Sequence, residues 1–164
     1  MKNIFDKIKL NYLYALYNTI ADAQLRHVDN VKRKYLENSM AFDETLSLLK
    51  DLKIVKYHPD DSLSVKRIST SRHTIEDFKK TFLPLLFSRN GKISEQVRSF
   101  LLNFQTENNL IFFKATEIQK IKFSAVRNLL LELEFIKASA DKKTYFVNSD
   151  FTHLPPLYVF PFIL

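Results

Sequence analysis

The side chains that could perform catalysis or bind a metal are scattered along this chain of 164 residues. Its four histidines are His27, His58, His73 and His153, and no two of them stand at metal-ligand spacing. Asp60 and Asp61 are adjacent, but side chains of sequence neighbours point in different directions. We therefore interpret them as part of a solvated turn and not as an acid/base pair. The local sequence also contains no serine–histidine–aspartate grouping and no compact carboxylate cluster of the kind that nuclease centres use. We therefore expect no metal site, no cofactor and no enzymatic activity, and a hydrolase assembled from dispersed residues is the least favoured alternative.

The glycine and cysteine counts exclude further chemistry. Gly91 is the single glycine, whereas phosphate-binding loops of the P-loop or dinucleotide type need several. The absence of cysteine excludes disulfides and thiolate metal sites, and it fits a reducing cytoplasm. The first ten residues lack the apolar core of a signal peptide, and no apolar run reaches the length of about 18 residues that a membrane helix needs. The sequence thus predicts a cytoplasmic protein without a membrane partner.

Positive charge is concentrated in the middle and the second half of the chain. The formal net charge is +7; residues 1–62 carry ten basic and nine acidic side chains, and residues 63–92 carry seven basic and two acidic ones. One short stretch holds five of these cations, Lys66, Arg67, Arg72, Lys79 and Lys80. On a single surface they would form a phosphate track, and we expect nucleic acid ahead of membrane as the anionic partner. The alternative interpretation is a solvated connector and a lysine-rich surface.

The spacing of apolar residues predicts the elements that must position these side chains. In the first half we expect helices over 10–24, 27–36 and 41–53 and strands over 54–57 and 63–68. In the second half we expect helices over 94–106, 116–120 and 124–134 and strands over 110–113, 135–138 and 144–148. Between them, Thr74 opens a predicted helix to Ser88, in which Pro84 is expected to cause a kink or an end. Ser94 is expected to cap its helix, and Leu36 to lie on the inner face of the second helix.

The order of these elements occurs twice, with Leu48–Val55 and Leu130–Lys137 as corresponding helix ends that run into hairpins. We therefore predict an α+β fold, mainly α with small β-hairpins. Two units, over 1–70 and 93–150, are joined by a basic helical linker over 71–92. An apolar tail with three prolines follows over 151–164, and we expect it to pack on the domain, in a partner protein or in a homodimer.

The second unit resembles the winged-helix family, a helix-turn-helix variant with a β-hairpin wing. Phe112–Ile121 resembles the short strand and second helix of that family, Ser124–Leu133 resembles its recognition helix, and Phe135–Val147 resembles its wing. The resemblance implies tandem winged-helix architecture in a DNA-binding regulator or accessory subunit. In this family the recognition helix enters the major groove and the wing touches the flanking backbone.

The resemblance also implies a set of contacts to double-stranded DNA. On the recognition helix they are Ser124, Arg127 and Asn128, of which arginine pairs with guanine edges and asparagine with adenine edges. Phosphate contacts are implied for Lys120 and Lys122 beside that helix and for Lys142 and Lys143 at the wing tip, with Lys66, Arg67 and Arg72 of the linker as further candidates. The alternative is a solvated helix face with a charged turn.

The first unit departs from this pattern. Its third helix begins with Asp43 and Glu44, and its wing tip carries Asp60 and Asp61, which would repel phosphate. Unless the basic triplet 32–34 makes the contact instead, this unit is expected to pack against protein. Some tandem winged-helix proteins are protein clamps in chromosome-organising or defence complexes. A protein–protein interaction subunit of that kind is therefore the rival interpretation.

Overall fold

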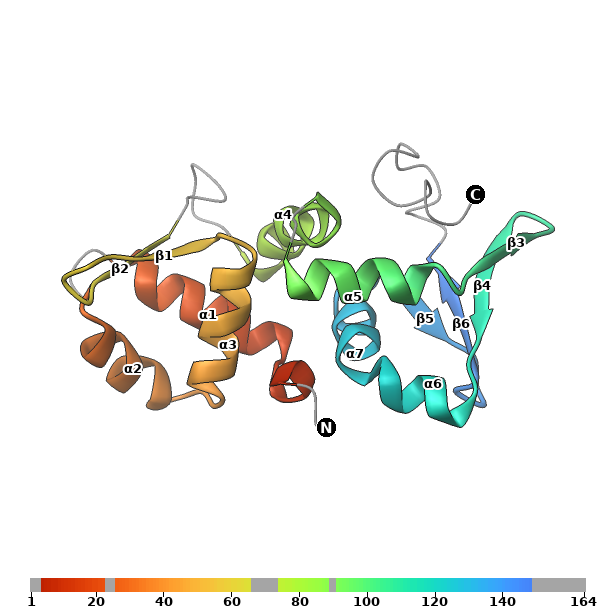
Figure 1. The fold of residues 1–164 in the computed structure, drawn as a ribbon, viewed down its shortest axis with the longest axis horizontal. Coiled ribbons are helices and arrows are strands. Elements are labelled where there is room, and N and C mark those ends of the chain that lie inside the picture. The colour runs from red at the N-terminus through yellow and green to blue at the C-terminus, as the bar shows by residue number, and fades with distance from the viewer. Residues whose placement is uncertain (1–3, 23–25, 66–73, 89–90, 149–164) are drawn as a thin grey trace. The chain divides into compact units, whose positions relative to one another are not determined.

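The computed structural model describes residues 4–22, 26–65, 74–88 and 91–148. Within these ranges the chain forms seven α-helices, a short 3-10 helix over Ile4–Lys7 and six strands (Figure 1). It divides into two compact units, Met1–Phe82 and Leu83–Leu164, and the division falls within α4 (Ile75–Ser88). The expected α+β class with small antiparallel sheets is confirmed. No helix within the described ranges is long and apolar enough to cross a bilayer.

Unit 1 packs three helices against a two-stranded hairpin. The elements are α1 (Leu10–Ala21), α2 (Val28–Leu36), α3 (Phe42–Asp51), β1 (Val55–Tyr57) and β2 (Leu63–Val65). The predicted helical spacing of α1 is confirmed by its buried side chains, Leu10, Leu13, Leu16, Tyr17 and Ile20. Val55 pairs with Val65 and Tyr57 with Leu63, and an isolated bridge joins His27, the residue before α2, to Ser62.

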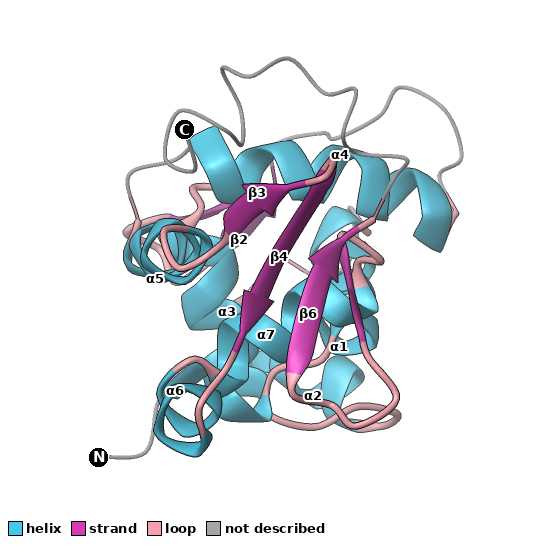
Figure 2. Ribbon diagram, turned by 90° about the vertical axis from the view of Figure 1, so that its right-hand side faces the viewer, coloured by secondary structure: helices cyan, strands magenta, loops and turns pink. Residues whose placement is uncertain are grey.

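Unit 2 packs the same kind of helices against a larger sheet. Its helices are α5 (Lys92–Leu101), α6 (Glu117–Lys122) and α7 (Ser124–Glu132), and its strands are β3 (Gln105–Glu107), β4 (Leu110–Lys114), β5 (Ile136–Ala138) and β6 (Thr144–Val147). The antiparallel sheet has the order β3-β4-β6-β5, and Figure 2 shows β4 beside β6. Phe100, 1% exposed, is the centre of the core, because its ring lies within 6.4 Å of the rings of Phe104, Phe113, Phe123 and Tyr145.

The third helix of each unit ends in the same way. Lys53 and Glu134 adopt a left-handed backbone, with φ of 58° and 60°. The next amides, of Ile54 and Phe135, donate to Leu49 and Leu130, five residues back. This is the hydrogen-bond pattern of a Schellman motif, which usually uses glycine at the left-handed position. This motif aligns Lys53 with Glu134. The predicted correspondence of Leu48–Val55 with Leu130–Lys137 aligns Lys53 with Phe135 instead, so the predicted register is wrong by one residue.

Three details of the predicted elements are also wrong. The helix expected over 94–106 starts at Lys92 after Gly91 as N-cap, so that Ser94 is fully buried inside α5 and caps nothing. It ends at Leu101, and the side-chain Nδ2 of Asn103 donates to the carbonyls of Ser99 and Phe100 in its last turn. Leu36 is 46% exposed, because Val31 and Tyr35 form the inner face of α2. By contrast, the helix predicted from Thr74 to Ser88 is confirmed as α4, and Pro84 lies inside it without ending it.

Candidate nucleic-acid interface

The short helix α6 is fixed at its start by a capping box. The Thr116 hydroxyl accepts from the backbone amide of Gln119 at 3.2 Å, and the Gln119 side chain accepts from the amide of Thr116 at 2.9 Å. Two amides at the helix start, which have no intrahelical partner, are thereby satisfied. Lys122 of this helix is exposed, whereas Lys120 is half-buried and its ammonium lies 3.4 Å from Glu117. Capping thus holds both predicted phosphate-binding lysines at the start of α7.

Helix α7 buries one side and presents a narrow polar strip on the other. Ala125, Val126, Leu129 and Leu130 are buried, whereas Asn128 is exposed and Ser124 is half-buried. Asn128 and Ser124 are one turn apart and therefore lie on the same face of the helix. The structure thus brings these two predicted contact residues together on an accessible strip.

Arg127 lies differently from the prediction that it faces outward. It is half-buried, its Nη1 donates to the carbonyl of Lys120 at 3.1 Å, and its guanidinium lies 6.0 Å from the ring centre of Tyr145. These contacts connect α7 to the end of α6 and to strand β6. Arg127 therefore has a packing role that the sequence pattern did not reveal.

The turn between β5 and β6 is built around one carboxylate. Oδ1 of Asp141 accepts hydrogen bonds from the Ser139 hydroxyl and from the backbone amide of Lys143. The Ser139 bond is the largest cause of a lowered pKa of Asp141, and the nearby charges of Lys143 and Lys120 contribute to it. Lys142 adopts a left-handed backbone at φ 57°, and its carbonyl accepts from the Tyr145 hydroxyl. The turn therefore holds two lysines in fixed backbone positions.

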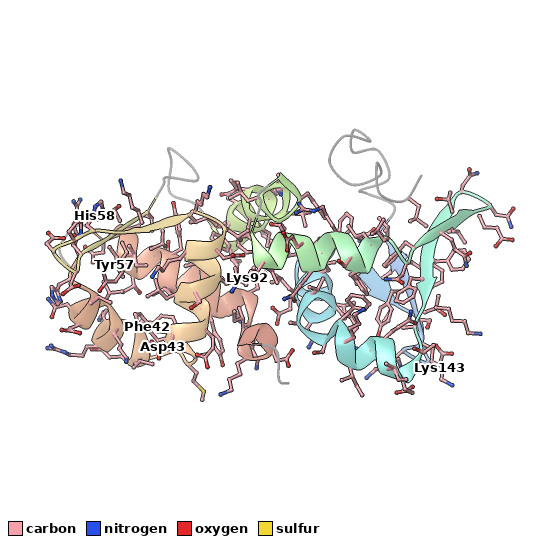
Figure 3. The ribbon with its side chains drawn as sticks, viewed as in Figure 1. Phe42, Asp43, Tyr57, His58, Lys92 and Lys143 are labelled. Carbon is pink, nitrogen blue, oxygen red and sulfur yellow. The ribbon has the colours of Figure 1, made fainter. Side chains whose placement is uncertain are left out.

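The start of α6 and this turn lie side by side. The amide of Ala115, just before α6, donates to the carbonyl of Lys143 at 2.8 Å. The charge of Lys120 in α6 also contributes to the lowered pKa of Asp141 in the turn. Figure 3 shows Lys143 beside α6. We call the four lysines Lys120, Lys122, Lys142 and Lys143 the lysine edge.

Unit 1 has acidic residues at the corresponding places. Asp43 is exposed at the start of α3, and Glu44 lies 3.7 Å from Lys7. In the β1–β2 turn, Asp60 accepts from both the hydroxyl and the amide of Ser62, which lowers the pKa of Asp60. Asp61 accepts from the Tyr57 hydroxyl at 2.9 Å and raises the pKa of that phenol. Figure 3 labels Asp43 on α3 and Tyr57 on the hairpin.

The basic triplet of α2 is exposed but engaged with neighbouring groups. Lys34 lies 3.1 Å from Glu37, Arg33 donates to the Asn30 side chain at 3.5 Å, and Lys32 lies over the Phe42 ring at 5.7 Å. Contacts of this exposed type contribute little to stability, so they leave the surface charge available.

The described histidines have local roles. His27 caps α2, because its Nδ1 accepts from the amide of Asp29 at 3.2 Å. His58 Nε2 lies 2.7 Å from Ser64 Oγ across the hairpin, while Asp60 of the turn accepts a hydrogen bond from Ser62. Within the described ranges no three His, Asp or Glu side chains group in a way that could hold a metal ion. His73 and His153 lie outside the described residues.

Other sequence predictions also fall outside these ranges. They concern Lys66, Arg67 and Arg72 of the linker and the apolar tail. Of the linker cations that are described, Lys80 is exposed and Lys79 lies 3.2 Å from Glu76. The phosphate track over 66–80 therefore stays a prediction.

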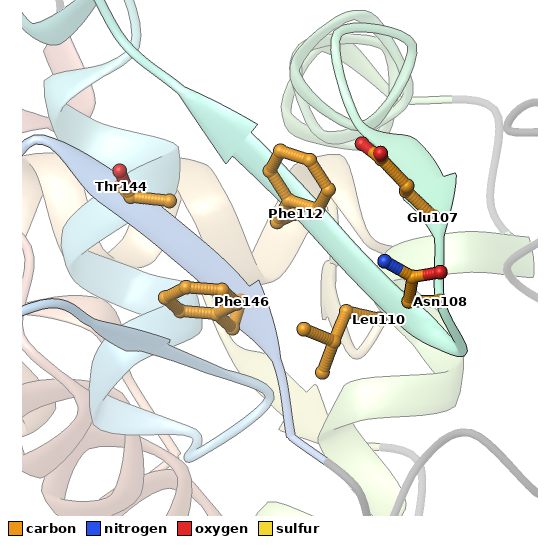
Figure 4. Close-up of a pocket in the computed structure, with 6 residues that line it drawn as sticks. All are labelled: Glu107, Asn108, Leu110, Phe112, Thr144 and Phe146. Carbon is orange, nitrogen blue, oxygen red and sulfur yellow. The ribbon is translucent and has the colours of Figure 1, made fainter.

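Sequence reasoning did not identify the outer face of the unit 2 sheet as a candidate site. Leu110, Phe112 and Phe146 line an open groove there, with a volume of about 330 Å³ (Figure 4). The two-residue period of a strand was a signal for this face, because it places Leu110 and Phe112 of β4 on the same side. Lys114, two residues after Phe112, lies on that side as well and is exposed.

Comparison of the chain with protein-family models, curated proteins and solved structures gave no match.

Proposed function

We propose that unit 2 is a winged-helix module that binds double-stranded DNA through α7 and the β5–β6 hairpin, with the lysine edge on the phosphates. The carrying observation is the joining of α6 to the hairpin turn by the Ala115–Lys143 hydrogen bond, which gathers cations from two elements. Lysine contacts to DNA phosphates supply a large part of the binding affinity, and this part does not depend on the base sequence.

The connectivity of unit 2 supports this proposal. A strand, β4, precedes the short helix α6 and pairs with the last strand, β6, which forms a hairpin with β5. In unit 1 the His27–Ser62 bridge connects the corresponding segments. Such an order, with a helix pair followed by a hairpin, is the arrangement that the winged-helix proposal requires of both units.

Base contacts are proposed for Asn128 and Ser124, which are accessible on α7. Arg127 is proposed to position α6 and α7, because its guanidinium is bound to the Lys120 carbonyl. A charge reversal at Arg127 would disturb this packing, and a loss of binding in that variant would not identify a DNA contact. The lysines of the turn are the cleaner test.

The test exchanges the turn charges of unit 2 for those at the equivalent places in unit 1. Lys142 and Asp61 both have a left-handed backbone, with φ of 57° and 63°, so Lys142→Asp keeps a residue that this conformation accepts. Combined with Lys143→Ser, it should weaken binding to a DNA duplex. It should also make the negative slope of log affinity against log salt shallower by about two. Fluorescence anisotropy of a labelled duplex would measure both.

The matched control is Lys32→Asp with Lys34→Ser, which makes the same charge change on exposed positions of α2 in unit 1. The proposal predicts a small effect for this pair. An equal loss of affinity in both variants would mean that only net charge matters, and the lysine edge would lose its assigned role. A wild-type chain that binds no duplex at low salt would end the proposal.

A protein–protein interaction subunit is the second candidate function, and one observation favours it. Ile118 and Ile121 of α6 are 79% and 77% exposed on adjacent turns. At the same distances from the N-cap, α2 of unit 1 carries Asp29 and Lys32, so this helix position does not require isoleucine. Paired exposed isoleucines suit a protein contact. The mass of the purified chain, alone and with the products of neighbouring genes, tests this alternative.

A further inference from the structure

The outer face of the unit 2 sheet presents two aromatic rings side by side. Phe112 on β4 and Phe146 on β6 are directly opposite each other in the antiparallel register, with ring centres 6.3 Å apart. Both side chains are half-buried, and the neighbouring Leu110 is 53% exposed. The core lies on the other face, where Phe113 and Tyr145 are buried. Ring surface is therefore accessible within the open groove of Figure 4.

Two lysines lie on the same face as these rings. Lys137 pairs with Phe146, and Lys114 pairs with Thr144, which is two residues from Phe146 along β6. Directly opposed residues of antiparallel strands share a face. Both lysines are exposed, and neither forms an ion pair with another described residue. Glu107 lines the opposite end of the groove, so an anionic chain would follow the lysine side.

We infer that this face binds single-stranded nucleic acid, with bases stacked on Phe112 and Phe146 and phosphates near Lys114 and Lys137. Proteins that bind single strands without sequence preference combine aromatic stacking surfaces with cations that follow the backbone. Thr144 and Lys114 adjoin Lys143 of the lysine edge, so the two surfaces are continuous. Only the link between this face and the lysine edge depends on the proposed duplex binding. Stacking of bases on the sheet does not require a bound duplex.

Two double variants separate stacking from simple apolar contact. Phe112→Leu with Phe146→Leu keeps apolar bulk but removes the rings, whereas Phe112→Tyr with Phe146→Tyr keeps them. For an oligothymidylate of about 12 nucleotides, the leucine pair should bind about tenfold or more weakly, and the tyrosine pair should bind like the wild type. Tyr57→Leu, at a 41% exposed aromatic of the unit 1 hairpin, is the matched control and should bind like the wild type.

Anisotropy of the labelled oligothymidylate and of a duplex, measured on each folded variant, distinguishes the two proposals. The leucine pair should leave duplex affinity unchanged, whereas the Lys142/Lys143 exchange should reduce it. Unchanged oligothymidylate binding by the leucine pair would overturn the inference, as would a tyrosine pair that binds as weakly as the leucine pair. A leucine pair that loses self-association while oligothymidylate binding is unchanged would also overturn it, and would assign the face to a protein contact.

Discussion

The two units use the same backbone devices but carry different exposed charges. In each, the third helix ends at a left-handed non-glycine residue and a short hairpin follows, with an aspartate accepting hydrogen bonds inside the turn. Among the described residues, 4–65 contain nine basic and nine acidic side chains, whereas 91–148 contain nine basic and six acidic ones. The comparison teaches that hydrogen bonds and buried residues can specify the local fold while exposed charges differ freely.

The hairpins also differ in length and in what their sheets present. Five residues separate the paired Tyr57 and Leu63, and six separate the paired Ala138 and Tyr145. The unit 2 hairpin is thus one residue longer, and in unit 2 Thr144, just before Tyr145, also pairs with Lys114 of β4. Unit 2 alone, among the described residues, extends its hairpin into a four-stranded sheet. The lysine edge and the aromatic face are therefore both features in which unit 2 departs from unit 1.

The largest expected effect on stability concerns the core of unit 2. Phe100→Ala should lower the free energy of unfolding by about 3–5 kcal/mol, because it removes a ring that contacts four others and leaves a cavity. Urea denaturation monitored by circular dichroism would measure it. A loss below about 1 kcal/mol would contradict this aromatic centre.

The next test concerns Arg127, which lies seven residues before the left-handed Glu134. The residue at the same distance before the left-handed Lys53 in unit 1 is the buried Leu46. Arg127→Ala should lower the free energy of unfolding by about 1–3 kcal/mol, through the lost bond to Lys120 and the lost packing on Tyr145. Arg127→Leu should recover part of the packing. Urea midpoints of both variants would measure these changes. An alanine variant as stable as the wild type would contradict a packing role for Arg127.

A smaller effect is expected at the start of α6. Thr116→Ala should lower the free energy of unfolding by about 1 kcal/mol, because the backbone amide of Gln119 loses the hydroxyl that accepts its hydrogen bond. Thermal denaturation provides the measurement, and Thr116→Ser is the control that retains the hydroxyl. If the serine and alanine variants were equally destabilised, the cap would not be the cause.

The smallest expected effect is on the pH dependence of stability, and it should be similar in the two units. The pKa values of Asp60 and Asp141 are lowered in the folded state, chiefly by hydrogen bonds from Ser62 and Ser139. Their stabilising contribution is present above the ordinary aspartate pKa of about 4 and is lost as the pH falls through the lower folded value. Asp60→Asn and Asp141→Asn should therefore reduce the acid sensitivity of stability, as measured by denaturation between neutral and acidic pH. Steeper acid sensitivity in either variant would contradict the sign.

Most of the helices and hairpins could be predicted because their signals are local. The spacing of Leu13, Leu16 and Ile20 identified α1, and the apolar sequence around Phe113 identified β4. Strand β3 was missed because its residues are polar and exposed on all sides. Its turn uses Asn108 and Asn109, with φ of 51° and 65°, in place of the glycine that such two-residue hairpin turns favour.

The candidate interface was predictable only in part. Lys120, Lys122, Lys142 and Lys143 were identified through the family resemblance, and their proximity depends on the Ala115–Lys143 bond between distant elements. The inward contacts of Arg127 depend on the placement of Tyr145, eighteen positions later, which helical spacing does not reveal. The Phe112–Phe146 pair required the β4–β6 register.

The salt dependence of duplex binding by the wild-type chain tests the central claim most directly. If four lysines of one edge meet phosphates, log affinity should fall against log salt with a slope of about −3 to −4. The Lys142/Lys143 exchange should flatten that slope by about two, and the Lys32/Lys34 control should leave it nearly unchanged. A flat wild-type slope, or one that all three chains share, would contradict a duplex-binding surface on unit 2.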